Sequence, residues 1–98
     1  MDVALLYFDG CPNWHETDQR LRQALAAAGL NVTPKYINVT SPEDAERLFF
    51  RGSPTVLVNG FDPFADASAP VGLSCRVFRT PDGLRGAPTV EQLVAVLR

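Results

Sequence analysis

The sequence predicts an α/β fold of the order β-α-β-α-β-β-α, in which three helices flank a mixed four-stranded sheet. Short apolar runs rich in strand-forming residues alternate with longer segments whose apolar residues recur at helical spacing. Helical connections favour parallel pairing of strands, whereas the last two strands lack such a connection and are expected to pair antiparallel. The 98 residues are expected to form one domain.

The first strand is expected within residues 3–8, a continuous apolar run that Asp9-Gly10 closes, which is typical of a strand buried on both faces. A helix follows, because Pro12 suits a first helical turn, where its missing N–H would have no partner. Gly29 is the expected end of this helix. Its apolar face, at helical spacing, consists of Trp14, Leu21, Ala24, Leu25 and Ala28.

The second strand is expected within residues 32–39, where Pro34 cannot donate a ladder hydrogen bond and therefore favours an edge strand or the entrance of a strand. The second helix begins after Ser41, which is a typical N-cap residue, and is expected to end at Gly52. The residues that we expect to face inward from this helix are Ala45, Leu48 and Phe49.

The third strand is expected at residues 55–58, and Asn59-Gly60 after it is a typical hairpin turn. Residues 61–72 predict a long loop, and residues 73–79 the fourth strand, followed by a turn at Pro81-Asp82-Gly83.

The last helix begins with the pattern of a capping box, in which Thr89 is the N-cap and Gln92 lies three residues later. The spacing of apolar residues predicts one buried stripe along this helix. That stripe consists of Val90, Leu93, Val94 and Leu97.

Composition and charge limit the classes of function. Apolar residues make up 46% and charged residues 20% of the sequence, which is typical of a folded protein. The net charge is −2 and no cations cluster, so neither nucleic acid nor a membrane is an expected partner. No apolar run approaches the roughly 20 residues of a membrane span, and residues 1–8 do not resemble a secretory signal. We therefore expect a cytoplasmic location, where cysteines are typically reactive or ligating.

Cys11 is the main candidate for a reactive residue. It follows the carboxyl end of the first strand and precedes the first helix, a position at which open α/β sheets bind ligands. A helix N-terminus favours the thiolate, so we expect an accessible thiol with a lowered pKa. The alternative is a small buried residue, which is a common role for cysteine.

Two motifs resemble the thioredoxin superfamily. Cys11-Pro12-Asn13-Trp14 stands in the place of its Cys-x-x-Cys motif, and Ser53-Pro54-Thr55 matches the segment that carries its cis-proline. Within that superfamily the chain looks most like small bacterial thioredoxin-like proteins, some of which are labelled as related to alkylmercury lyase. The resemblance covers most of the chain. It implies that Pro54 is cis and lies beside the reactive cysteine, and that the neighbouring backbone binds a peptide or thiol substrate.

The sequence departs from the motif at Trp14, which stands where the superfamily has its second cysteine. That second thiol normally resolves the mixed disulfide. Three alternatives follow: glutathione or another external thiol resolves it, Cys75 resolves it, or the protein is not a disulfide enzyme. Trp14 is expected to pack, and it is a candidate for an apolar wall beside the substrate.

Two interpretations of Cys75 stay open. In the simplest sheet topology the fourth strand starts at the end far from Cys11, which keeps the thiols apart and makes Cys75 a buried residue of an edge strand. Extended, however, the loop at residues 61–72 spans on the order of 40 Å, which is enough to return the chain across the sheet. The acidic residues of this part of the chain, Asp62, Asp66 and Asp82, are expected to form turns and face solvent.

His15 is the only histidine and stands four residues after Cys11, so both side chains fit on one helical face. It is a candidate support for the thiolate or a proton acceptor, and the alternative is an exposed polar residue. With Asp9 and Cys75 these residues lack the paired spacing of a structural zinc site, so we expect no resident metal or cofactor.

The sequence thus predicts a thiol-dependent redox protein that exchanges with a protein or small-molecule thiol or disulfide, for which glutathione is a candidate external thiol. Its expected catalytic residues are Cys11 and Cys75. The expected substrate-binding residues are Trp14, Ser53, Pro54 and Thr55, and Pro12 and His15 are expected to support the helix N-terminus. The alternatives are a non-enzymatic binding module of the same fold and a thiol-based handler of soft metal ions such as mercury.

Overall fold

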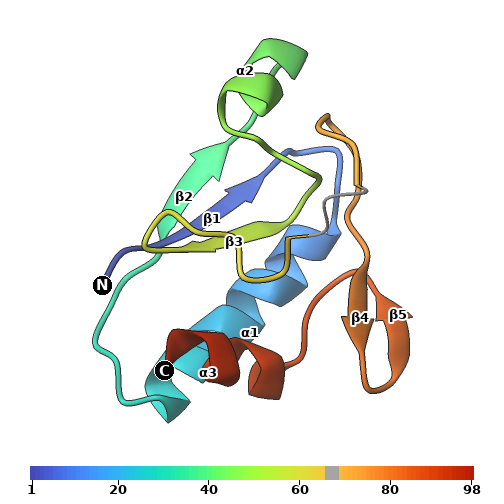
Figure 1. Cartoon of the computed structure of the whole chain (residues 1–98). Coiled ribbons are helices and arrows are strands. Elements are labelled where there is room, and N and C mark those ends of the chain that lie inside the picture. Colours follow the sequence, from blue (N-terminus) through green and yellow to red (C-terminus); the bar gives the residue numbers. More distant parts are fainter. Residues whose placement is uncertain (66–68) are drawn as a thin grey trace.

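A computed structural model describes residues 1–65 and 69–98 of the chain. Its main sheet has the strand order β2-β1-β3, with β1 (Val3–Tyr7) in the centre, β2 (Lys35–Asn38) parallel to it and β3 (Thr55–Val58) antiparallel (Figure 1). The mixed sheet and the edge position predicted for the second strand are therefore confirmed. The parallel pairing expected of helix-joined strands holds for β2 and is wrong for β3, which follows α2 and yet runs antiparallel to β1.

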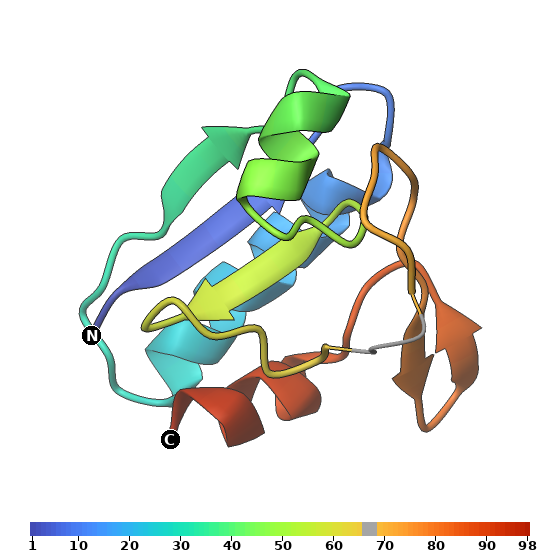
Figure 2. The same ribbon diagram turned by 45° about the horizontal axis from the view of Figure 1, so that its top comes forward.

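The three helices cover both faces of this sheet. Helices α1 (Asn13–Ala27) and α3 (Val90–Leu97) pack on one face, and α2 (Pro42–Arg47) packs on the other (Figure 2). Alternation along β1 sends Leu5 toward α1 and α3 and Leu6 toward α2, so each face has its own apolar core. Within the described ranges, no helix is both long enough and apolar enough to cross a membrane.

The helix ends follow the local signals in the sequence. The Ser41 side chain accepts a hydrogen bond from the Asp44 N–H at the start of α2, and Thr89 and Gln92 form the complete capping box of α3. After α1, Gly29 takes a left-handed conformation with φ +72°, which glycine adopts without a steric cost.

The expected course of the second helix is wrong in its last turn. Helix α2 ends at Arg47 instead of reaching Gly52, and Phe49 has a φ of +52°. This left-handed residue changes the direction of the chain, so Phe50 enters the core while Phe49 is 74% exposed. The prediction that Phe49 faces inward is therefore wrong.

The predicted fourth strand is also wrong. Among the described residues the main sheet has three strands, and β4 (Phe78–Thr80) pairs with β5 (Gly83–Arg85) in a separate hairpin. The segment before this hairpin meets Ser53 through an isolated parallel bridge at Cys75. A parallel bridge requires the chain to return across the sheet after β3, as the long loop allows. Within that predicted loop, residues 66–68, Asp66 included, lie outside the described part of the chain.

Candidate dithiol site

The two cysteines meet although they are 64 positions apart in the sequence. Cys11 lies in the turn between β1 and α1, Cys75 lies in the segment that leads into β4, and their Sγ atoms are 3.0 Å apart. Figures 1 and 2 show this segment passing beside the turn after β1. Of the two open interpretations of Cys75, the returning loop is thus confirmed and the buried cysteine of an edge strand is wrong, because Cys75 is exposed.

The two thiols differ sharply in access to solvent. Cys11 is buried with an exposed fraction of 0%, so the expectation of an accessible thiol at this position is wrong. Two hydrogen bonds hold Cys11 in this buried position. Its backbone N–H donates to the Phe8 carbonyl at 3.2 Å, and its thiol points inward and donates to the Ser53 carbonyl at 3.3 Å. The Cys11 sulfur also accepts a hydrogen bond from the thiol of Cys75, which is an exposed residue.

Ser53 joins the elements of the site. Its backbone N–H donates to the Ser74 carbonyl at 2.7 Å, and its own carbonyl accepts from the Arg76 N–H at 2.9 Å. The same carbonyl accepts from Cys11, and the Ser53 hydroxyl accepts from the Phe8 N–H at 3.4 Å. The resemblance implied that backbone near Pro54 binds a substrate, but both backbone groups of Ser53 already bind residues of this chain.

The residues around Ser53 are buried and closely packed. The Ser53-Pro54 peptide bond is cis, as the resemblance implied. Gly52 has a φ of +117°, and a Cβ atom there would lie 3.0 Å from Arg76 Cβ and 3.1 Å from the Ser74 carbonyl oxygen. Only glycine therefore allows the segment with Cys75 to approach this closely.

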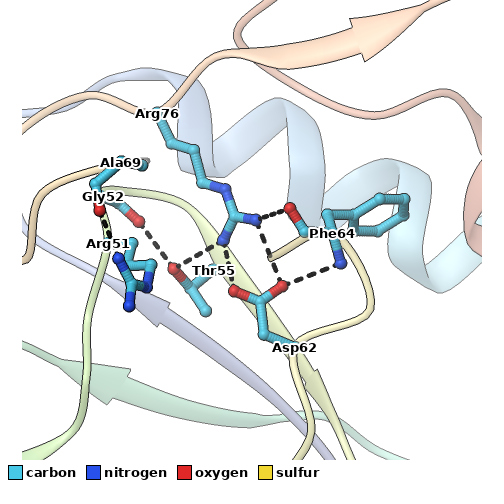
Figure 3. Close-up of polar contacts among 7 residues, drawn as sticks. All are labelled: Arg51, Gly52, Thr55, Asp62, Phe64, Ala69 and Arg76. Carbon is cyan, nitrogen blue, oxygen red and sulfur yellow. Dashed lines mark hydrogen bonds and ion pairs between the residues drawn. The ribbon is translucent and has the colours of Figure 1, made fainter. Parts of the chain in front are cut away.

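Arg76 holds the segment from its other side, in a group that we call the Arg76 cluster (Figure 3). Its side chain is 6% exposed, and its guanidinium binds both oxygens of the Asp62 carboxylate, at 2.7 and 3.2 Å. It also donates to Thr55 Oγ1 at 3.3 Å and to the Phe64 carbonyl, and it lies 4.8 Å from the centre of the Phe78 ring. The guanidinium of arginine holds its N–H donors in a rigid planar fork, which suits a pocket with polar groups at fixed positions.

The sequence reasoning missed the Arg76 cluster. It expected Asp62 to form a turn and to face solvent. The turn is confirmed, because the carboxylate accepts from the Phe64 N–H at 3.0 Å, whereas the exposure is wrong, because the same carboxylate is largely buried against Arg76. The sequence gives no signal for the cluster, because Cys75 and Val77, which face outward, and Arg76 and Phe78, which face inward, alternate in burial but not in polarity. An arginine at an inward position indicates a buried partner, but the sequence does not say which one.

The other predicted site residues lie at the start of α1 and do not reach the sulfurs through any contact described. Trp14 is half-buried against the core and stacks with Tyr7 and His15, at ring distances of 4.1 and 3.9 Å. His15 is exposed, which matches the alternative interpretation. Pro12 is the N-cap residue of α1, one position earlier than expected. Trp14 therefore packs, as expected, and Pro12 stands at the start of α1 without a side-chain capping hydrogen bond.

The contact with Cys11 changes the acidity of Cys75. The pKa of Cys75 is raised above its ordinary value of 9.0, first because its thiol donates to Cys11, then because of partial desolvation and the charge that Cys11 carries as a thiolate. A pair of adjacent thiols gives up its two protons in separate steps, because a second negative charge is repelled by the first.

The remaining potential metal ligands do not gather at this site. Among residues 1–65 and 69–98, no group of three or more His, Cys, Asp or Glu side chains is arranged to hold a metal ion. Asp9 is exposed, and its carboxylate accepts a hydrogen bond from the Asn38 amide at 3.3 Å.

Comparison with known proteins does not identify a family. No protein-family model matches the chain, and neither a curated protein nor a solved structure shows significant similarity to it.

Proposed function

We propose that the chain is a thioredoxin-like protein of thiol–disulfide exchange, whose redox couple is Cys11 and Cys75. The observation that carries this proposal is the distance of 3.0 Å between the two sulfurs. A disulfide bond needs them to approach by about 1 Å more, to the usual bond length. Both cysteines are free thiols in this structure, so it corresponds to the reduced form of the couple.

Two thiols in contact can reduce an external disulfide without a third component. The pair gives up two electrons and two protons and forms the Cys11–Cys75 bond, while the external disulfide takes them up and is released as two thiols. The reverse reaction oxidises external thiols. Trp14 in the place of a second motif cysteine is compatible with this chemistry, because Cys75 supplies the second sulfur.

Three further features support the proposal. The helices lie on both faces of a mixed sheet, the first cysteine follows the central strand, and the Ser53-Pro54-Thr55 segment lies directly beside it. The superfamily that the sequence resembles uses the same relative positions for a thiol and its cis-proline segment.

The test is mild oxidation of the reduced protein with oxidised glutathione, followed by mass spectrometry without reductant. We expect an intramolecular disulfide, seen as the loss of two hydrogen atoms and as one cross-linked peptide pair. Cys11→Ser and Cys75→Ser are matched controls that lack it. If the wild-type protein instead accumulates only glutathione adducts or intermolecular dimers, the proposed couple is wrong.

The same contact favours a second candidate function, which is binding of a soft, two-coordinate metal ion such as Hg²⁺ by two thiolates. It predicts that one equivalent of Hg²⁺ protects both cysteines from alkylation in the wild-type protein, and that each serine variant loses this protection. Protection without any disulfide under mild oxidation would favour metal binding over exchange.

A further inference from the structure

We infer that Cys75, rather than Cys11, is the sulfur that forms the bond with the external thiol, and that Cys11 acts as the resolving thiol. This inference rests on the proposed function, since it assigns the two roles within that couple. It reverses the roles that the sequence motif suggests, in which the cysteine before the first helix makes the initial attack.

Access from solvent is the first argument. An attacking sulfur must reach the target sulfur directly, and the Cys11 side chain is entirely buried. Its thiol faces the Ser53 carbonyl on one side and the Cys75 sulfur on another. Cys75 is exposed and lies on the outward side of an extended segment, as does Val77. An external partner therefore meets Cys75 first.

The positions of the two sulfurs also suit these roles in the oxidised protein. When an external thiolate attacks Cys75 Sγ, the bond to Cys11 breaks and its electron pair stays on Cys11. That negative charge arises before the first turn of α1, where a helix N-terminus stabilises it. Attack on Cys11 would instead require the external thiolate to enter a buried position, and it would leave the charge on Cys75, which precedes a strand rather than a helix.

The opposite direction uses the same steps in reverse order. The Cys75 thiolate attacks one sulfur of an external disulfide, forms a mixed disulfide and releases the first external thiolate. Cys11 then attacks Cys75 Sγ, which closes the intramolecular bond and expels the second external thiolate. The protons of the two cysteines leave with these thiolates, so two external thiols are released for each disulfide consumed.

The backbone contacts indicate which partners this site takes. The N–H and carbonyl of Ser53 are already bound to Ser74 and Arg76, so they offer no strand pairing to a peptide while Cys75 is in place. Recognition of a partner by main-chain pairing with Ser53 is therefore blocked in this arrangement. A low-molecular-weight thiol or disulfide that approaches from solvent is the partner class that this arrangement fits.

The test maps the mixed disulfide in the wild-type protein. The oxidised protein is exposed briefly to reduced glutathione, quenched with acid and analysed by peptide mapping. We expect glutathione on Cys75 at least about tenfold more often than on Cys11, in line with the selectivity that access confers on cysteine reactions. Repeating the reaction in urea is the control, because unfolding exposes both sulfurs and the preference is expected to disappear.

The serine variants give a second measurement. Cys11→Ser is expected to form a stable mixed disulfide with oxidised glutathione at Cys75, whereas Cys75→Ser, which keeps a side chain of similar size over residue 11, reacts much more slowly. Adducts that form mainly on Cys11 would overturn the inference while leaving the redox couple intact. If the wild-type protein never forms the intramolecular disulfide, the proposed function itself fails.

Discussion

Cys11 and Cys75 belong to two regions that are held in place by different interactions. The region around Cys11 is the sheet with its helices, and it is stabilised by burial of apolar side chains on both faces of β1. The segment with Cys75 is held by polar groups: two backbone hydrogen bonds to Ser53 and the ion pair of Arg76 with Asp62. The β5 strand that follows is exposed along its whole length.

This difference separates stability from redox chemistry. Apolar packing determines whether the domain is folded, and it depends on many side chains at once. The distance between the sulfurs depends on a few directional contacts of one segment. Substitutions in the apolar core are therefore expected to change stability alone, whereas substitutions in the segment with Cys75 are expected to change the disulfide equilibrium as well.

Replacement of Arg76 by Met is expected to have the largest effect. It leaves the Asp62 carboxylate without its cation in a largely buried position, which typically costs about 3–5 kcal/mol of unfolding free energy. The loosened segment no longer holds Cys75 against Cys11, so the disulfide becomes easier to reduce. Urea unfolding and a redox titration against glutathione measure the two changes.

Two further variants serve as controls for Arg76. Arg79→Met removes an exposed arginine of β4 and is expected to leave both measurements close to wild type. Asp62→Asn in the Arg76→Met background removes the unpaired charge and is expected to recover part of the stability. Wild-type stability and an unchanged disulfide equilibrium in Arg76→Met would show that the ion pair does not hold the segment.

Leu21→Ala tests the other region. Leu21 is fully buried between α1 and the sheet, and its truncation is expected to cost roughly 2–5 kcal/mol of unfolding free energy. The contacts of Ser53 and Arg76 are untouched, so the disulfide equilibrium of the folded protein should stay at its wild-type value. A parallel shift of both measurements would contradict the separation of the two regions.

Gly52→Ala is expected to have an intermediate effect that is centred on the site. The residue keeps a φ of +117°, and the new methyl group meets Arg76 and the Ser74 carbonyl. We expect a loss of about 1–3 kcal/mol from backbone strain and a disulfide that is easier to reduce. Gly72→Ala is the matched control, because nothing lies within 4 Å of its added Cβ. Equal behaviour of the two variants would exclude a role for the close approach at Gly52.

The smallest expected effect is on how the stability of the reduced protein depends on pH. The pKa of Cys75 is higher in the folded protein than the ordinary 9.0, so the folded state keeps this proton where the unfolded chain has lost it. Its contribution to stability is complete below pH 9 and is lost as pH rises through the folded pKa. The midpoint temperature of thermal unfolding should therefore fall more steeply above pH 9 in the wild type than in Cys75→Ser. Identical slopes would mean that the thiols are not coupled.

Local sequence patterns predicted much of the fold, because the interactions behind them join residues that are close in sequence. The capping residues Ser41 and Thr89 act within one helical turn, and the apolar spacing of α1 indicated its buried face. The prediction that Phe49 faces inward is wrong because the left-handed conformation of this residue ends the helical spacing of apolar residues. Nothing in the composition of that turn indicates the left-handed conformation.

For the candidate site, the sequence by itself determined that a cysteine follows the first strand, that a proline segment precedes the third, and that a second cysteine stands far along the chain. Only the tertiary structure decided that Cys75 contacts Cys11 and that Cys75, not Cys11, faces solvent. The physical reason is that these properties depend on the path of a long loop. That path is stabilised by an ion pair and two backbone hydrogen bonds between residues distant in sequence, and no local pattern encodes which partners they find.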